Sequence, residues 1–172
     1  MITHTVYTDG SAMNSSGGWT AVIIPAEDPV SQFSVSGGTS ATVTNNYAEL
    51  MALILAIETI RLNTRRPFIH LYSDSNYVGQ GSTEWIHNWS AGGKLCIDKP
   101  KQIPNSPLWR RINAFLQDGV KIKYTHVKGH NGDFMNELCD RTSNDVRIAM
   151  DVAGNSIHRN LLELYHGEDN ES

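Results

Sequence analysis

The sequence predicts an α/β fold in which helices flank a mixed five-stranded sheet. Segments rich in β-branched and aromatic residues alternate with segments whose apolar residues recur at helical spacing. Their order is three strands, helix, strand, helices, strand, helix, which favours an antiparallel meander joined to helix-connected strands. The 172 residues, 40% of them hydrophobic, suffice for one domain with a buried core.

The first three strands are expected at residues 3–8, 19–24 and 32–36, because β-branched and aromatic residues concentrate there. Residues 9–18 are rich in Gly, Ser and Asn and are expected to form a loop. Pro25 is expected to end the second strand, because proline has no backbone N–H to donate to a neighbouring strand.

The clearest helix is expected at residues 46–62. Its apolar residues form one stripe at helical spacing: Leu50, Leu53, Ile54, Ile57 and Ile60. Met51 and Leu55 widen this stripe, which indicates a deeply packed helix. Asn45 and Asn46 precede the stripe and are expected to supply the N-cap.

The rest of the domain alternates short strands and helices. Strands are expected at 68–73 and 120–125, and helices at 75–79, 83–89, 107–116 and 134–150. Residues 91–105 and 126–133 are expected to be irregular. The last helix is expected to pack through Met135, Leu138, Thr142, Val146 and Ala149.

Composition divides the chain into a domain at residues 1–150 and an acidic tail at residues 151–172. Acidic and basic residues balance in the domain, so the tail carries the whole net charge of −4. We expect the tail to form at most one short helix before becoming disordered, and it could contact a protein partner. Residues 94–128 hold eight basic residues against two acidic ones, which is typical of a nucleic-acid footprint or of a solvated face.

Several classes of protein are disfavoured. No apolar run reaches the ~18 residues that a membrane span needs, and the first residues lack the pattern of a signal peptide. We therefore expect a cytoplasmic protein, and no feature requires more than a monomer. Cys96 and Cys139 lack a CxxC partner, which argues against a zinc site or a disulfide framework, and Cys139 is expected to be buried.

Four acidic residues stand at strand ends or on helices that otherwise resemble core: Asp9, Glu49, Asp74 and Asp140. A carboxylate beside apolar neighbours is costly unless a cation meets it. If the four converge, they repel one another, and divalent metal would relieve that repulsion. The pattern predicts a two-metal site for phosphoryl transfer.

Each acid also has an ordinary structural interpretation. Asp9 could be a turn residue, and Glu49 could close a capping box with Asn46. Asp74 could cap the helix that begins at Ser75, and Asp140 could be a solvated helix residue. These interpretations compete with the metal site, although they weaken when the four acids are considered together.

Five motifs agree in order and spacing with one family: YTDGS (7–11), TNNYAEL (44–50), SDSNYV (73–78), WIHNW (85–89) and HVKGHNGDFMNELCD (126–140). The chain closely resembles type 1 ribonuclease H of the bacterial kind over about residues 3–150. The resemblance implies the ribonuclease H-like fold and a catalytic domain at residues 1–150. Any single motif would be a weak signal, and the set is highly specific.

The resemblance implies an endonuclease that cuts the RNA strand of RNA/DNA hybrids, leaving 5′-phosphate and 3′-hydroxyl ends. It implies two Mg²⁺ ions, for which Mn²⁺ substitutes, bound by Asp9, Glu49, Asp74 and Asp140. His130 matches the family histidine that assists proton transfer or product release, while a plain loop position is the alternative.

The resemblance also implies a set of substrate contacts. Asn14, Asn45, Asn46 and Asn76 would sense the 2′-hydroxyl in the hybrid groove, because amides donate and accept hydrogen bonds. Thr44 matches a residue of the DNA-phosphate pocket. Trp85 and Trp109 match aromatic residues beside the DNA, with core packing as the alternative for each.

One departure and two alternatives remain. Residues 89–105, which align with the basic handle of the family, keep only Lys94, Lys99 and Lys101 against Asp98, which predicts weaker, more salt-sensitive binding. A non-catalytic hybrid-binding module is one alternative, although all four acids are present. A DNA nuclease of the same superfold, such as a resolvase or integrase core, is the other. Primer removal, hybrid clearance and phage or plasmid replication are all compatible settings.

Overall fold

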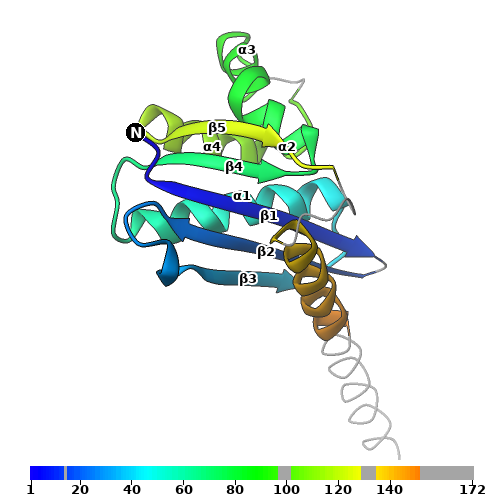
Figure 1. Ribbon diagram of the computed structural model, residues 1–172. Helices are drawn as coiled ribbons and strands as arrows, with labels where there is room; N and C mark the ends of the chain where they lie inside the picture. Colours follow the sequence, from blue (N-terminus) through cyan, green and yellow to red (C-terminus); the bar gives the residue numbers. More distant parts are fainter. Residues whose placement is uncertain (14, 97–101, 129–134, 152–172) are drawn as a thin grey trace, which may run out of the picture.

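Figure 1 shows the computed structural model, which describes residues 1–13, 15–96, 102–128 and 135–151. One sheet has the strand order β3-β2-β1-β4-β5, with β1 (His4–Met13), β2 (Ser16–Pro25), β3 (Phe33–Thr39), β4 (Phe68–Ser73) and β5 (Lys121–His126). The first three strands pair antiparallel, whereas β4 is parallel to β1 and β5 is parallel to β4. The mixed five-stranded sheet is therefore confirmed.

The hairpin of β1 and β2 is longer than the sequence predicted. Residues 9–13 and 16–18, expected in a loop, continue the two strands. Asp9 pairs with Thr20 inside this ladder, so it is not a turn residue. The prediction failed because glycine is typical of turns but also occurs in strands that a neighbouring backbone approaches closely.

Two glycines of the hairpin permit such an approach. A Cβ atom at Gly10 would lie 2.3 Å from the carbonyl carbon of Ala48 in helix α1 (Asn45–Arg61). A Cβ atom at Gly18 would lie 2.3 Å from the carbonyl oxygen of Ser143 in the last described helix. Both helices rest directly on the strand backbone, one on each face of the sheet (Figure 1).

Helix α1 forms the centre of the core. The five residues of the predicted stripe are all buried, whereas Met51 and Leu55, which were expected to widen it, are half-buried. The buried residues of the helix are Ala48, Leu50, Ala52, Leu53, Ile54, Ala56, Ile57 and Ile60. The N-cap is Thr44, whose hydroxyl accepts from the backbone N–H of Tyr47 at 3.0 Å. The predicted cap at Asn45 and Asn46 is wrong by one residue, because both asparagines already belong to the first helical turn.

The remaining helical elements are η1 (Pro29–Ser31), α2 (Asn76–Gln80), η2 (Gly81–Trp85), α3 (Ile86–Ala91) and α4 (Ser106–Gln117). The two short helices predicted between residues 75 and 89 form one continuous run, in which η2 is a π-helical turn. Gly81 permits this turn to lie against the ring of Trp109, which a Cβ atom would approach to 2.3 Å.

Residues 135–151 form a helix that crosses the face of the sheet opposite α1 (Figure 1). Its fully or almost fully buried residues are Asn136, Cys139 and Ser143. The predicted packing face of this helix is therefore displaced by one residue: Met135, Leu138, Thr142 and Val146 are only half-buried, and Ala149 is exposed. Val146 still packs against the sheet, because its Cγ1 would lie 2.9 Å from a Cβ atom at Gly38 of β3. Small side chains face the sheet because Gly18 brings the two backbones close together.

Among the described residues, no helix combines the length and apolarity needed to cross a membrane. Cys139 is fully buried, as predicted, and Cys96 is exposed. The acidic tail predicted at residues 151–172 lies outside the described residues except for Asp151, which belongs to the last helix.

Candidate active site

The site begins where β1 and β4 separate. Their parallel pairing ends at Tyr7 and Tyr72. Asp9 lies two residues farther along β1, and Asp74 directly follows β4. The carboxyl ends of parallel strands that diverge form a crevice at which ligands commonly bind.

Glu49 joins these two aspartates from the second turn of α1. The close approach at Gly10 brings α1 against β1, and the backbone N–H of Gly10 donates a hydrogen bond to the Glu49 carboxylate. One carboxylate oxygen from each of Asp9, Glu49 and Asp74 lies within 4.8 Å of the other two. Asp9 is only 4% exposed, so this cluster extends into the interior of the domain.

Asp140 reaches the same place from the helix at residues 135–151. It adjoins Asp9 closely enough to share a hydrogen bond with it when one of the two is protonated. The amide nitrogen of Asn144 donates to the carboxylate of Asp140 at 3.3 Å. The structure thus brings together the four acids that the sequence singled out, from two strands and two helices.

Burial and mutual repulsion disfavour ionisation of this cluster. Burial, and then the charges of Glu49 and Asp74, raise the pKa of Asp9 to about 9. Burial and the charge of Asp74 raise the pKa of Glu49 to about 7. Burial and the same two carboxylates, Asp74 and Glu49, raise the pKa of the nearby Tyr124 phenol to about 12. The local field is therefore strongly negative.

The cluster fits a divalent cation. With every carboxyl group ionised, no donor among the described residues meets Oδ2 of Asp9, although that oxygen is buried. An uncompensated buried oxygen is costly, and a cation would offset both this cost and the repulsion. Carboxylate oxygens are hard ligands of the kind that Mg²⁺, Mn²⁺ and Ca²⁺ prefer over zinc or copper.

The ordinary structural interpretations of two other acids do not match the geometry. Thr44 caps α1, so Glu49 is too far into the helix to close a capping box with Asn46. Ser75, rather than Asp74, caps α2, because the Ser75 hydroxyl accepts from the N–H of Val78 at 3.2 Å. Neither carboxylate therefore caps a helix, and both belong to the acidic cluster.

The predicted groove residues that the structure describes stand at the N-terminal ends of α1 and α2. The side-chain oxygen of Asn45 accepts from the N–H of Ala12 at 2.8 Å, which fixes its amide beside β1. Asn76 accepts from the Tyr124 hydroxyl at 3.1 Å. Thr44, Asn46 and Asn76 are exposed at the ends of their helices. Asn14 and His130 lie outside the described residues.

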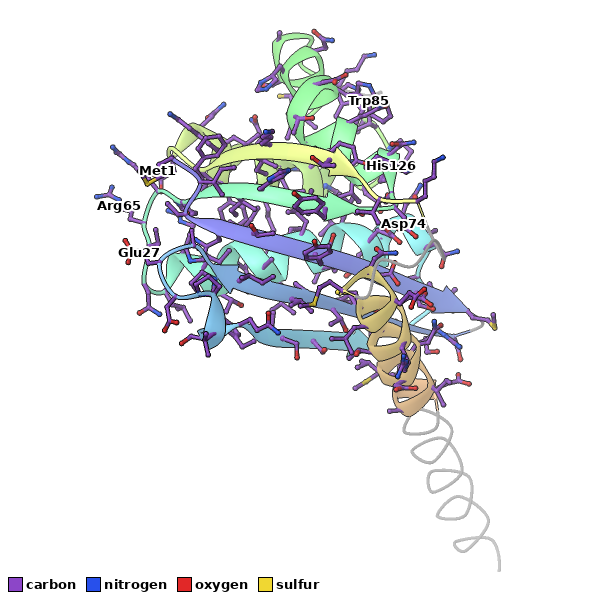
Figure 2. The ribbon with its side chains drawn as sticks, viewed as in Figure 1. Met1, Glu27, Arg65, Asp74, Trp85 and His126 are labelled. Carbon is purple, nitrogen blue, oxygen red and sulfur yellow. The ribbon has the colours of Figure 1, made fainter. Side chains whose placement is uncertain are left out.

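The two predicted tryptophan contacts differ. Trp109 is fully buried, and its indole N–H donates to the Tyr77 hydroxyl at 2.9 Å. The core-packing alternative therefore holds for Trp109, because its side chain offers no exposed surface for a substrate. Trp85 is half-buried beside Trp89, and it lies at the same end of the molecule as Asp74 in Figure 2.

Sequence reasoning did not single out Tyr124 and His126 at the end of β5. The Tyr124 hydroxyl and Nδ1 of His126 are 3.0 Å apart, and His126 lies next to Asp74 in Figure 2. Tyr124 lies in the predicted strand and His126 directly follows it, at the start of the motif at residues 126–140; their i, i+2 spacing was the signal that could have found them. A separate cavity of about 470 Å³ involves none of the four acids and lies at the start of β1, lined partly by Ile23, Phe33 and Ile60.

Comparisons with known proteins point to one family. The RNase H family model matches residues 2–147. Ribonuclease H of Rhodopirellula baltica is 38% identical over 140 residues, covering 79% of this chain and 85% of the relative. Ribonuclease H of Phenylobacterium zucineum is 41% identical over 138 residues, covering 78% and 84%.

Solved structures show the same fold. LC9-RNase H1, described as a type 1 RNase H with the type 2 active-site motif, superposes with a TM-score of 0.73 at 25% identity, over 86% of this chain and 72% of that one. LC11-RNase H1, solved with an RNA/DNA hybrid, superposes with a TM-score of 0.59 at 19% identity, over 85% and 97%.

Proposed function

Because the chain belongs to the ribonuclease H family, we propose that it is an endonuclease that hydrolyses the RNA strand of RNA/DNA hybrids. The products would carry 5′-phosphate and 3′-hydroxyl ends. The observation that carries this proposal is the convergence of three carboxylates within 4.8 Å, with Asp140 adjoining Asp9. A buried acidic cluster of this kind suits metal-assisted phosphodiester hydrolysis.

Asp9, Glu49, Asp74 and Asp140 are the proposed ligands of two Mg²⁺ ions, for which Mn²⁺ would substitute. When bound, the ions supply an activated water and neutralise charge on the leaving 3′-oxygen. The raised pKa values of Asp9 and Glu49 support this assignment, because a nearby dication favours the ionised form of both carboxyl groups.

The other residues of the site would bind and orient the hybrid. Thr44 would contact a DNA phosphate, and Asn45, Asn46 and Asn76 would face the groove where the 2′-hydroxyl distinguishes RNA from DNA. Asn14 is proposed for the same groove, and Trp85 for the DNA strand. His130 would assist proton transfer or product release, since the unperturbed pKa of histidine lies near neutral pH.

We propose a monomer that acts in the cytoplasm on hybrids formed during DNA replication. The tail beyond Asp151 would contact a protein partner. The absence of a membrane-spanning helix among the described residues is compatible with this setting. Sedimentation of the full chain tests the monomer, and affinity capture with and without the tail tests the partner.

A cleavage assay on a labelled hybrid tests the function. Asp9→Asn or Asp74→Asn should reduce Mg²⁺-dependent cleavage at least ~10³-fold while the fold survives, because each removes a charged metal ligand. Asp145→Asn, an exposed acid on the same helix as Asp140, is the matched control and should cut normally. Cleavage retained by Asp9→Asn would refute the proposed roles.

The substrate is tested by comparing two duplexes of one sequence, an RNA/DNA hybrid and double-stranded DNA. We expect cleavage of the hybrid and none of double-stranded DNA. Cutting of DNA instead would favour a DNA nuclease of the same superfold. Binding of the hybrid without any cleavage would favour a non-catalytic module.

A further inference from the structure

A chain of side-chain hydrogen bonds leads from Arg147 to the carboxylate of Asp140. Nε of Arg147 donates to Oγ of Ser11 at 3.2 Å. The Ser11 hydroxyl donates to Oδ1 of Asn144 at 2.8 Å. The Asn144 amide nitrogen donates to Oδ1 of Asp140 at 3.3 Å and to its backbone carbonyl at 3.0 Å.

Each group in this chain has one role that chemistry allows. A guanidinium only donates, so Ser11 must accept from Arg147 and has its single proton left for Asn144. The Asn144 oxygen accepts the hydrogen bond from the Ser11 O–H, so the amide NH₂ is directed toward Asp140. The orientation of the Asn144 amide is therefore determined, and linked hydrogen bonds of this kind strengthen one another.

Two further bonds fix the helix of Asp140 on β1. The buried hydroxyl of Ser143 donates to the backbone carbonyl of Asp9 at 3.0 Å. The thiol of Cys139 lies 3.5 Å from the carbonyl of Tyr7 and donates to it. Asp140 and Asn144 therefore stand at a set position beside the strand that carries Asp9 and Ser11.

We propose that Asn144 is a positioning residue, held by Ser11 and Arg147, that fixes the orientation of the Asp140 carboxylate. Oδ1 of Asp140 accepts from Asn144, and the Asp140 carboxyl group adjoins Asp9. This inference rests on the proposed metal site and deepens it. It adds Ser11, Asn144 and Arg147 to the residues on which metal affinity depends, although none of them would touch the metal.

The test measures Mn²⁺ binding by calorimetry with the full-length chain, without substrate. Asn144→Ala should raise the Kd for Mn²⁺ about 10-fold, because residues that orient metal ligands typically contribute 10- to 100-fold to affinity. Thr142→Ala is the matched control. Its hydroxyl donates to the Leu138 carbonyl at 2.8 Å within the same helix, so its Kd should stay within about twofold of wild type.

A double-mutant cycle tests the chain of bonds itself. Ser11→Ala should also weaken Mn²⁺ binding. Because Ser11 would act through Asn144, adding Ser11→Ala to Asn144→Ala should change the Kd by less than about twofold. A purely structural defect would lower the melting temperature in parallel, so thermal unfolding without metal is recorded for every variant.

The outcomes separate this inference from the proposed function. Wild-type affinity in Asn144→Ala, or losses that multiply in the double variant, would overturn the positioning role while leaving the nuclease assignment intact. A wild-type protein that binds no Mn²⁺ would overturn the metal site and the positioning role together. Hybrid cleavage by wild type, measured in the same samples, shows whether the nuclease assignment itself has failed or only the positioning role.

Discussion

At the scale of single residues, Asp9 has the least favourable surroundings in the site. It is 4% exposed, it faces other carboxylates, and one of its oxygens meets no donor among the described residues. Asp9 is held there because strand β1 continues past it, and Asp9 itself pairs with Thr20 of β2. The protein therefore carries a local instability that ligand binding can relieve, which is common at functional sites.

This instability predicts how stability depends on pH. The pKa values of Asp9 and Glu49 are raised in the folded state, so the folded protein binds more protons than the unfolded one above about pH 4. The stabilising contribution is fully present below that pH, declines progressively as pH rises, and is lost once pH has passed the folded-state pKa values of about 7 and 9. Without divalent metal, the melting temperature should fall over this range.

Scanning calorimetry in a chelator measures this dependence. Asp9→Asn should remove most of the fall and stabilise the metal-free protein at pH 8 by ~1–3 kcal/mol. Asp145→Asn, which is exposed, should keep the wild-type profile. Added Mg²⁺ should stabilise wild type more at high pH than at low pH. A melting temperature that rises from neutral to alkaline pH in chelator would contradict the argument.

The four acids could be selected from sequence because carboxylates beside apolar positions are unusual. Choosing between cap, turn and ligand required the structure, because Thr44 and Ser75 are the residues that cap α1 and α2. For Trp109, the structure excluded a role that the sequence had suggested. The resemblance suggested a substrate contact, whereas the ring is fully buried in the core.

At the scale of elements, the site depends on two helices that lie unusually close to β1 and β2. Gly10 and Gly18 leave no side chain between the strand and helix backbones. Glu49 and Asp140 belong to these two helices, so their distance from Asp9 is set by backbone contact. Packed backbones deform little, which holds the carboxylates together despite their repulsion.

Gly10→Ala tests this dependence. The new Cβ atom would lie 2.3 Å from the carbonyl carbon of Ala48, so α1 must shift. We expect a loss of ~1–3 kcal/mol in the free energy of unfolding and a larger proportional loss of cleavage, because Glu49 moves with α1. Urea denaturation and the hybrid assay measure the two effects.

Gly92→Ala serves as the control, because its Cβ atom would lie 3.2 Å from its closest neighbour, the Asn88 carbonyl oxygen, at the end of α3. It should change stability by less than ~1 kcal/mol and leave cleavage intact. Equal stability and activity in Gly10→Ala and wild type would show that neither stability nor cleavage requires the close contact between α1 and β1 at Gly10.

Periodicity predicted α1 well because its buried stripe is apolar and long. The same method found the helix at residues 135–151 but missed the centre of its buried face, which consists of Asn136, Cys139 and Ser143. Small and polar residues give no hydrophobic signal. Their burial is favourable here because Ser143 and Cys139 donate to β1 carbonyls, which lie more than 130 residues away in the chain.

At the scale of the whole molecule, the two ends of the sheet differ in chemistry. Asp74, His126 and Trp85 lie toward one end, whereas Met1, Glu27 and Arg65 lie at the other (Figure 2). The hybrid would therefore bind at the first end. Residues 1–150 have no net charge, so attraction to nucleic acid must come from local clusters of basic residues.

Few basic residues remain where the family has its handle, which predicts weak, salt-dependent binding. Fluorescence anisotropy of a labelled hybrid with Asp9→Asn protein should give a Kd weaker than nanomolar near ~0.1 M salt, and affinity should fall as salt rises. Lys94→Ala should reduce the slope of log K against log salt by about 1 if Lys94 contacts a phosphate.

Arg65→Ala, at the opposite end, should change neither affinity nor slope (Figure 2). Nanomolar binding that is independent of salt would contradict the prediction. Such binding would indicate that base, sugar and stacking contacts dominate over phosphate contacts.

The sequence alone determined the order of strands and helices, the apolar stripe of α1, the four candidate ligands and the family. These follow from local periodicity and from residue types at fixed spacing. Only the tertiary structure decided that β1 and β2 continue through a glycine-rich segment, which side of the last helix is buried, and that Ser11 and Asn144 meet. Each of these depends on contacts between segments that are far apart in the chain. Local sequence patterns cannot predict such contacts, because only folding brings the hydrogen-bond partners together.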